Sequence, residues 1–321
     1  MQLSIIIPVF NEEKNIEKLF DRLHKAIAPM GVEFEFVFVN DGSRDQSMLM
    51  IRVLAQQHPF VRFVDFSRNF GHQIAVTAGL EHSRGENIVI IDADLQDPPE
   101  LIPLLHEKMK EGFDVVYARR KKRKGETALK KFTARLFYRT LQKLTSVDIP
   151  VDTGDFRILS RRILNVLLAM PEQEKFLRGQ ISWAGFKQTF LEYDRDERAG
   201  GKTGYTYRKM IRFALDGITS FSNIPLKFAT MAGFFVSGIT FLLSLYALYS
   251  RFISHDYVPG WTSLILSVLF IGGIQLICIG IIGEYISRIS ANIRNRPLYV
   301  IRDTNCTHGA EDVAVHKHFH A

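Results

Sequence analysis

Residues 88–100, with the sequence IVIIDADLQDPPE, join an apolar run to three aspartates, Asp92, Asp94 and Asp97. The apolar residues predict a buried strand. Side chains alternate along a strand, so Asp92 and Asp94 would point the same way. Two carboxylates placed in this way could hold one hard cation, Mg²⁺ or Mn²⁺, and through it a diphosphate. The alternative is a strand end followed by turn-forming residues, since Asp and Pro are common in loops.

Strand and helix patterns alternate along the first part of the chain. Apolar runs predict strands at residues 4–9, 34–39, 60–66, 88–91 and 115–118. Helical spacing of apolar residues follows at residues 12–28, around 48–54, at 72–82 and at 101–111. This alternation predicts an α/β fold with right-handed crossovers and a mainly parallel sheet covered on both faces.

Polar loops follow the predicted strands at residues 8–12, 40–45, 67–71 and 92–97. In open parallel sheets, ligands bind beyond the carboxyl ends of the strands. These loops would therefore converge on one edge of the sheet, and this favours a metal site over a plain turn at Asp92 and Asp94. Further on, residues 148–157 (DIPVDTGDFR) predict a turn with three acidic residues, and residues 192–207 predict a mobile loop rich in Gly and charge.

A strongly basic stretch follows the last of these strands. Residues 119–124 read RRKKRK, and Lys130, Lys131, Arg135 and Arg139 continue the positive charge. Because the stretch follows a strand that feeds the same edge, it is suited to bind phosphates or anionic headgroups. The alternative is an ordinary solvated charged face.

Two runs, residues 228–250 and 261–283, contain no Asp, Glu, Lys or Arg. Each is long enough to cross a bilayer, which takes roughly 20 apolar residues, so we expect two transmembrane helices rather than two buried core helices. The short link at residues 251–260 predicts a hairpin. The outer ends of the hairpin carry more positive charge than the link, which predicts that both chain termini are cytoplasmic. These charges are Lys227, Arg288, Arg294, Arg296 and Arg302, against Arg251 in the link.

The composition narrows the class of partner. The net charge of +7 over 321 residues fits nucleic acid, anionic lipid or phosphorylated substrates, and the membrane runs favour lipid over nucleic acid. Residues 208–225 predict an amphipathic helix on the membrane surface, the alternative being an ordinary packed helix. No signal peptide is expected before the first strand, and Cys278 and Cys306 predict neither a disulfide nor a zinc site. Residues 307–321 predict a disordered end.

Five short motifs occur in order: PVFNEE at residues 8–13, NDGSRD at 40–45, RNFG at 68–71, DADLQDPPE at 92–100 and DTGDFR at 152–157. With the two membrane runs after them, the chain resembles a family 2 glycosyltransferase of the polyprenyl-phosphate type. It is most similar to bactoprenol glucosyltransferases, and dolichol-phosphate mannose synthases are more distant. The resemblance covers residues 1 to about 302.

The resemblance implies a glycosyltransferase of the inner (cytoplasmic) membrane with a GT-A type, Rossmann-like catalytic domain. We expect the cytoplasmic catalytic domain at residues 1–207, the amphipathic interface helix at 208–225, the transmembrane hairpin at 226–287 and a cytoplasmic tail at 288–321. Such an enzyme transfers one sugar, expected to be glucose from a UDP-linked donor, to membrane polyprenyl phosphate at the cytoplasmic face. The reaction would be metal-dependent and inverting, with Mg²⁺ or Mn²⁺ as cofactor.

The resemblance also assigns donor-binding residues. Five of them would surround the nucleoside: Pro8, Phe10, Asn11, Glu12 and Asp41. Asn11 and Asp41 could instead cap helices. Asp92 and Asp94 match the metal-binding pair of the family, and Gln96 and Asp97 in the same motif are expected to contact donor or metal.

Asp155 matches the acidic residue that acts as catalytic base in the family, with Asp152 as runner-up. A phosphomonoester has a second pKa near 6, so the acceptor needs little deprotonation and Asp155 is also a candidate for orienting its neighbours. Arg119, Arg120 and Arg123 are expected to bind the acceptor phosphate. Arg198 matches a loop arginine that closes on the donor diphosphate. Lys202 is assigned to the same phosphate because Gly204 stands where similar enzymes carry lysine.

Two other classes of function fit parts of the sequence. A membrane-anchored scaffold could keep the nucleotide crevice without turnover, but it has no need of Asp92, Asp94 and Asp155 together. A processive polysaccharide synthase would normally need more membrane helices than the two predicted here. Two membrane helices give a small footprint that a homo-oligomer would enlarge. The sequence does not identify the sugar, the base or the acceptor chain length.

Overall fold

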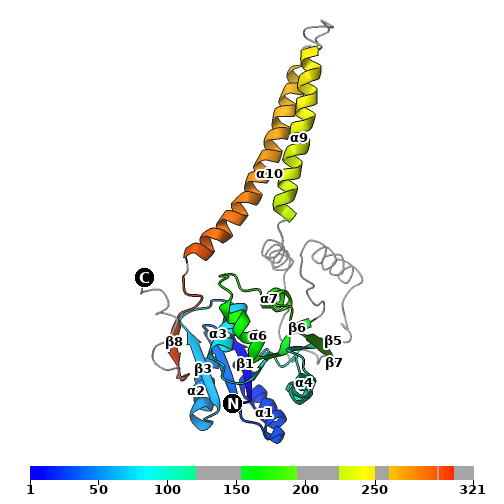
Figure 1. Cartoon of the computed structure of the whole chain (residues 1–321). Helices are drawn as coiled ribbons and strands as arrows, with labels where there is room; N and C mark the ends of the chain where they lie inside the picture. Colours follow the sequence, from blue (N-terminus) through cyan, green and yellow to red (C-terminus); the bar gives the residue numbers. More distant parts are fainter. Residues whose placement is uncertain (121–152, 194–223, 250–259, 295, 307–321) are drawn as a thin grey trace, which may run out of the picture. The chain divides into compact units, whose positions relative to one another are not determined.

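The computed structural model describes residues 1–120, 153–193, 224–249, 260–294 and 296–306. The chain divides into two units. The first contains residues 1–139, 147–206 and 296–321, and the second contains residues 140–146 and 207–295. Within the described residues, the first unit is an α/β domain and the second is a pair of long helices (Figure 1).

The α/β unit is built on one eight-stranded sheet with the order β7-β5-β6-β4-β1-β2-β3-β8. Its strands are β1 Leu3–Val9, β2 Phe34–Asn40, β3 Val61–Phe66, β4 Asn87–Ile90, β5 Val115–Arg120, β6 Thr153–Ser160, β7 Gln188–Tyr193 and β8 Ile301–Thr304. Parallel pairing joins β1 to β2 and β4, β2 to β3, and β5 to β7. Strand β8 is antiparallel to β3, and β6 is antiparallel to β4 and β5. The predicted mainly parallel α/β sheet is confirmed.

Helices cover both faces of this sheet. One face carries α1 Ile16–Ile27, α2 Ser47–Gln57 and α4 Ile102–Met109, and the other carries α3 His72–His82, α6 Arg161–Ala169 and α7 Leu177–Trp183. Side chains of β1 alternate between the two cores, with Ile5 and Ile7 in the first and Ile6 in the second. A Cβ at Gly79 would lie 2.1 Å from Ile6 Cγ2, so glycine allows α3 to pack directly against β1.

Strand β6 differs from the sequence-based prediction. Residues 148–157 predicted a turn, but Thr153–Ser160 form a strand between β4 and β5, with Ile90 paired to Arg157. Phe156, Ile158 and Leu159 are fully buried and pack in the core. The acidic residues before them made the strand pattern hard to recognise in the sequence. The predicted loop at residues 192–207 likewise begins inside strand β7, which ends at Tyr193.

The predicted cytoplasmic tail is also different. Helix α10, Trp261–Arg294, continues past the expected boundary at residue 287. Strand β8 then adds to the edge of the sheet beside β3. Part of the chain that follows the hairpin is therefore integral to the α/β unit.

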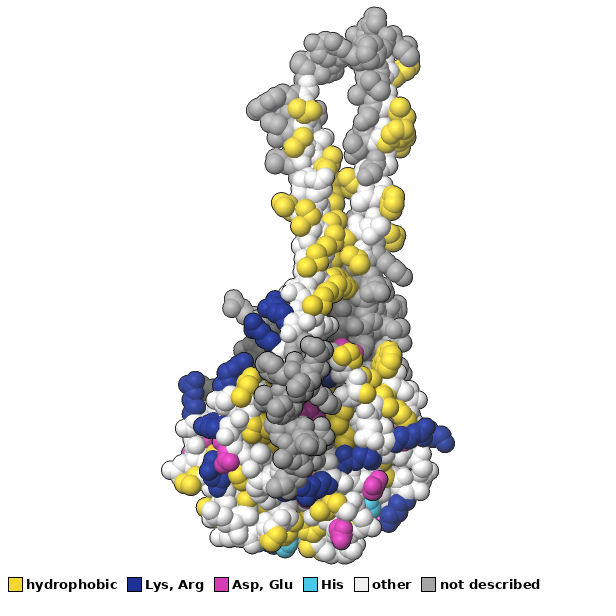
Figure 2. All heavy atoms as spheres, turned by 60° about the vertical axis from the view of Figure 1, so that its left-hand side comes forward, with side chains coloured by type: hydrophobic (Ala, Val, Ile, Leu, Met, Phe, Trp, Pro, Cys, Tyr) yellow, Lys and Arg dark blue, Asp and Glu magenta, His cyan; other side chains and the backbone are white. Residues whose placement is uncertain are grey.

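The second unit contains α9 Ile224–Tyr249 and α10, which lie side by side as a hairpin. Large apolar side chains on both helices are exposed, for example Phe234 at 76% and Leu276 at 71% (Figure 2). Among the described residues, the helical segment Phe270–Arg294 is long and apolar enough to cross a membrane. The span expected at residues 228–250 stays a prediction, and the amphipathic helix expected at 208–225 lies almost wholly outside the described residues.

Candidate active site

The carboxyl ends of β2 and β3 are joined by the side chain of Asp41. The Asp41 carboxylate accepts hydrogen bonds from the backbone N–H groups of Phe70 (2.7 Å) and Gly71 (3.0 and 3.2 Å). The Asn69 side-chain amide also donates to it at 2.9 Å. Burial raises the pKa of Asp41, and the two backbone N–H donors oppose that rise. Asp41 therefore holds the loop before α3 in place and does not cap a helix that follows its own strand.

Gly42 allows the loops after β2 and β3 to approach closely. Its φ is +67°, and a Cβ there would lie 2.5 Å from the carbonyl carbon of Arg68. A side chain at this position would collide with backbone that cannot move aside. The NDGS and RNFG motifs are therefore two parts of one packed structure.

A pocket of about 170 Å³ opens beside these loops. Its lining combines predicted donor-binding residues with residues from the start of α3: Pro8, Val9, Phe10, Asp41, Asn69, Gly71, His72 and Ala75. The structure thus brings Pro8, Phe10 and Asp41 together in one pocket, and their contact with a donor stays a prediction. The aromatic ring of Phe10 is exposed at the mouth, where it could stack on a flat ligand.

Asn11 and Glu12 follow Phe10 in the sequence but are not among the residues that line the pocket. Asn11 Oδ1 accepts the backbone N–H of Arg44 at 2.8 Å, and the Asn11 N–H donates to Ser43 Oγ at 2.9 Å. The Glu12 N–H donates to Ser47 Oγ at 3.0 Å. Asn11 links the loop after β1 to the loop after β2, and Glu12 links it to the start of α2. Contact of either residue with a donor stays a prediction.

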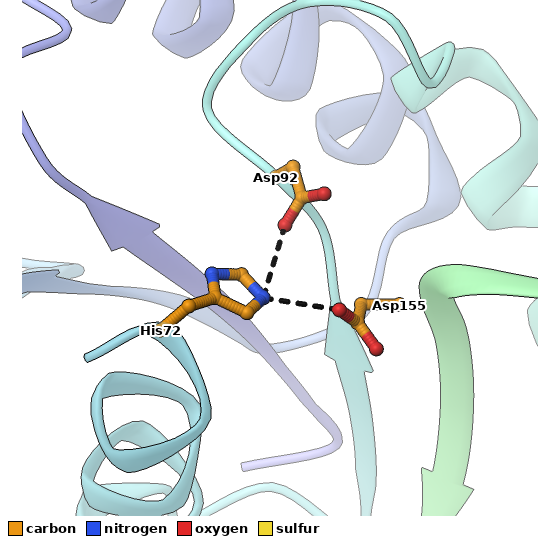
Figure 3. Close-up of side chains that lie close together, drawn as sticks. All are labelled: His72, Asp92 and Asp155. Carbon is orange, nitrogen blue, oxygen red and sulfur yellow. Dashed lines mark hydrogen bonds and ion pairs between the residues drawn. The ribbon is translucent and has the colours of Figure 1, made fainter. Parts of the chain in front are cut away.

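His72, at the start of α3, lies between two carboxylates from other elements (Figure 3). Its Nε2 is 3.1 Å from Asp155 Oδ2 and 3.6 Å from Asp92 Oδ1. Asp92 follows β4 and Asp155 lies on β6, so three segments supply the cluster. His72 also lines the pocket described above, and this single side chain connects the pocket to the acidic cluster.

The charges in this cluster depend on one another. Burial lowers the pKa of His72, but the hydrogen bond with Asp155 and the negative charge of Asp92 outweigh it and raise the pKa to about 9. Burial and the neighbouring carboxylates raise the pKa of Asp92 to about 6, although the positive charge of His72 opposes this. A cation between the two carboxylates therefore stabilises the ionised form of both.

Asp155 is surrounded by positive groups. Its Oδ1 accepts a hydrogen bond from Arg157 Nη2 at 2.7 Å and lies 3.3 Å from Arg178 Nε. Burial raises the pKa of Asp155, but Arg178, the hydrogen bond with His72, and Arg157 together hold it well below its usual range. A carboxylate of such low pKa is a weak base. The geometry instead suits Asp155 to orient His72 and Arg178.

The cluster of His72, Asp92 and Asp155 fits a divalent metal ion. Their ligand atoms lie within 4.8 Å of one another and comprise one imidazole nitrogen and two carboxylate oxygens. Asp92 Oδ1 is buried and accepts no hydrogen bond from the part of the chain that the structure describes. A mixed nitrogen and oxygen set suits Mn²⁺, and carboxylates with water suit Mg²⁺.

The residues that follow Asp92 are arranged differently from the prediction. Strand β4 ends at Ile90, and Ala93 and Asp94 form a turn, so alternation along a strand does not align the two aspartates. Asp94 Oδ1 accepts the backbone N–H of Gln96 at 3.1 Å, and Asp97 is fully buried and accepts a hydrogen bond from Tyr193. Among the described residues, the cluster contains Asp92 but not Asp94. Roles for Asp94, Gln96 and Asp97 at the donor stay predictions.

Comparison with known proteins identifies the family. The model described as Glycosyl transferase family 2 matches residues 4–168, and the model described as GtrB C-terminal hairpin matches residues 224–289. The uncharacterized glycosyltransferase YkcC of Bacillus subtilis (strain 168) is 47% identical over 320 residues, which cover 100% of this chain and 98% of the relative. The chain belongs to glycosyltransferase family 2.

Further relatives support the same placement of this glycosyltransferase. The SfII prophage-derived bactoprenol glucosyl transferase of Shigella flexneri is 40% identical over 305 residues, 95% of this chain and 99% of the relative. Among solved structures, the mannosyltransferase PcManGT from Pyrobaculum calidifontis, in complex with GDP-Man and Mn²⁺, has a TM-score of 0.50 at 18% identity, covering 92% of this chain and 86% of that chain. The structural match supports the fold alone.

The remaining predicted residues of the glycosyltransferase are only partly described. Arg119 pairs with Glu192 and lies 3.5 Å from the centre of the Phe190 ring, so the structure gives it local partners, and phosphate binding stays a prediction. Arg120 is the last residue of β5. Arg123, Asp152, Arg198 and Lys202 lie outside the described residues.

Sequence reasoning missed two residues of this glycosyltransferase site. His72 directly follows the RNFG motif, so a titratable residue beside a conspicuous loop was the available signal. Arg178 lies on α7 between the buried side chains of Leu177 and Ile181. An arginine beside such apolar residues was the available signal for a buried charge. Neither is near Asp155 in the sequence, and only the fold brings the three together.

Proposed function

We propose that this glycosyltransferase moves one sugar, glucose, from UDP-glucose to a membrane polyprenyl phosphate at the cytoplasmic face, with inversion and with a divalent metal ion. The observation that carries the proposal is that His72 belongs both to the pocket with Pro8, Phe10 and Asp41 and to the cluster with Asp92 and Asp155. A nucleoside in the pocket would place its diphosphate beside the cluster. The relatives named bactoprenol glucosyl transferase support glucose as the sugar and a polyprenol-linked acceptor.

The chain's own residues have distinct tasks in this reaction. His72 and Asp92 would hold the metal, which when bound neutralises the diphosphate of the leaving nucleotide. Asp155 holds His72 when no metal is bound. It also holds Arg178, which provides a positive charge for the acceptor phosphate. A phosphomonoester is largely a dianion at neutral pH, so the acceptor oxygen attacks without a strong base.

Membrane attachment is the second part of the proposal. The exposed apolar side chains along α9 and α10 support burial of the hairpin in a bilayer, because a water-exposed surface of this kind is unusual. The match to the GtrB C-terminal hairpin over residues 224–289 supports two spans. We propose that both termini and the α/β unit are cytoplasmic, as the distribution of positive charge predicts.

The decisive experiment is transfer by the purified full chain in detergent. Labelled UDP-glucose, undecaprenyl phosphate and Mn²⁺ or Mg²⁺ should give a lipid that carries one hexose, measured by mass, and EDTA should prevent its formation. NMR of the product should show the inverted anomer. Tight UDP binding without a labelled lipid for any nucleotide sugar would favour a scaffold, and a long glycan would favour a processive synthase.

A further inference from the structure

Residues 299–302, which follow the hairpin, form hydrogen bonds at the C-terminal end of strand β3. The Ser67 N–H donates to the carbonyl of Val300 at 2.9 Å, and Arg302 Nη2 donates to the carbonyl of Phe66 at 2.8 Å. Ser67 opens the loop whose amides bind Asp41, and the same loop ends at His72. Hydrogen bonds with Val300 and Arg302 thus fix the point where this loop begins.

An aromatic series continues the contact into the loop. The buried ring of Tyr299 stacks on Phe66, with centroids 4.9 Å apart and planes at 24°. Phe66 in turn meets the ring of Phe70 edge to face at 5.6 Å. The Phe70 N–H donates to Asp41, which lines the pocket. The packed rings therefore connect Tyr299 to a residue of the pocket wall.

A polar series runs from the same segment to the loop after β2. Arg302 Nε lies 3.3 Å from Asp65 Oδ2, and Asp65 Oδ1 accepts a hydrogen bond from Asn40 Nδ2 at 2.7 Å. Asn40 Oδ1 then accepts the N–H of Ser43 at 3.3 Å. The Asp65 carboxylate is almost fully buried, so the guanidinium groups of Arg302 and of Arg52, the latter at 3.9 Å, offset a charge that would otherwise be costly to bury.

We propose that residues 299–302 form a brace that positions the donor pocket and His72, and that Arg302 is its main positioning residue. Arg302 takes part in both series of contacts. It donates to the carbonyl of Phe66, which precedes the loop that ends at His72, and it pairs with Asp65, which binds Asn40. Residues 299–302 follow α10 in the sequence. The support for the pocket therefore comes from a segment on the C-terminal side of the hairpin. The effect on donor binding rests on the proposed function, whereas the effect on loop order does not.

The test compares the full chain in detergent with its Arg302→Ala variant. Without the brace, amide hydrogen exchange at residues 67–72 should become faster, and UDP with Mn²⁺ should bind about fivefold more weakly, as fits one partly exposed ion pair and one hydrogen bond. The Arg302→Lys variant should recover part of the loss, since lysine keeps the charge but cannot bind both partners in the same geometry.

Asn305→Ala is the matched control. The Asn305 side chain donates to the carbonyl of Val61 at 3.1 Å and accepts the N–H of Phe63 at 2.7 Å, at the opposite end of β3. Its removal should weaken the contact with the start of β3 but leave residues 67–72 and UDP binding unchanged. Equal effects in both variants, or no effect in Arg302→Ala, would overturn the proposal. If Arg302→Ala does not fold, Arg302→Lys carries the same comparison.

Hydrogen exchange also separates this proposal from the proposed function. It is measured on the protein without ligand, so a wild-type chain that binds no UDP and transfers no sugar would refute the function. The exchange at residues 67–72 would still decide whether Arg302 orders the loop.

Discussion

The Nε2 atom of His72 lies 3.1 Å from Oδ2 of Asp155, although 83 residues separate the two along the chain. The same nitrogen is 3.6 Å from Asp92 Oδ1. One imidazole therefore contacts two carboxylates, one from the loop after β4 and one from β6, and also forms part of the pocket wall. This arrangement makes His72 the residue whose replacement is most informative.

His72→Gln should weaken Mn²⁺ binding by about 10- to 100-fold or more, because it removes the imidazole nitrogen itself, and even the loss of an outer-shell partner of a ligand costs that much. Isothermal titration of the full chain with Mn²⁺, in the presence of UDP, measures this directly. His106→Gln is the matched control, since His106 is a largely buried histidine on α4 outside the cluster. Unchanged affinity in His72→Gln would exclude His72 as a ligand.

The pKa of His72 predicts a pH dependence of stability in the metal-free protein. Folding raises this pKa from 6.5 to about 9, so the folded state binds the proton more tightly than the unfolded state. The resulting stabilisation is fully present below pH 6.5 and is lost as the pH rises to about 9. The melting temperature in EDTA should fall across this window in the wild type and fall less in His72→Gln. Parallel curves for the two proteins would contradict the assignment.

Metal binding should follow the opposite trend over the same range. A metal ion that uses Nε2 must displace its proton, so the apparent Mn²⁺ affinity should rise between pH 6.5 and about 9. Titrations at a series of pH values test this, with His72→Gln as the reference. A pH-independent affinity in the wild type would show that the proton and the metal do not compete.

The strands were predictable because their signal is local. Apolar runs gave β1 to β5 to within about two residues, since buried parallel strands need continuous apolar sequence. Strands β6, β7 and β8 were not predicted, and for β6 and β8 the physical reason is clear. Acidic residues precede the apolar part of β6, and β8 is a four-residue edge strand, IRDT, stabilised by its partner β3 and not by its own composition.

The site was predictable only as far as its parts lie in recognisable loops. Pro8, Phe10 and Asp41 could be grouped because parallel strands bring their carboxyl ends to one edge. The partners of Asp155 could not be found in this way. His72 begins one helix and Arg178 lies on another, and their proximity depends on how both helices pack on the sheet.

Asp92→Asn should stabilise the metal-free protein while it abolishes transfer. Burial raises the pKa of Asp92 from 3.8 to about 6, so its ionisation at neutral pH costs stability, of the order of 1 to 3 kcal/mol. Asparagine keeps the shape without the charge, and the melting temperature in EDTA should rise by a few degrees. Asp94→Asn, in the same loop, should also lose transfer but leave the melting temperature unchanged. A lower melting temperature for Asp92→Asn would contradict the pKa argument.

Arg178→Ala should raise KM for the lipid phosphate far more than KM for UDP-glucose. Asp155 holds Arg178 at 3.3 Å beside the cluster, where a guanidinium can bind an incoming phosphate. Loss of one charge-assisted contact should raise KM for the lipid by about tenfold or more. Steady-state kinetics with each substrate varied in turn measure the two constants.

Arg162→Ala is the matched control, because Arg162 lies 5.0 Å from the centre of the Phe186 ring and outside the cluster. Equal increases in both KM values for Arg178→Ala would make this arginine a general support for the site, since an acceptor contact must affect the lipid selectively.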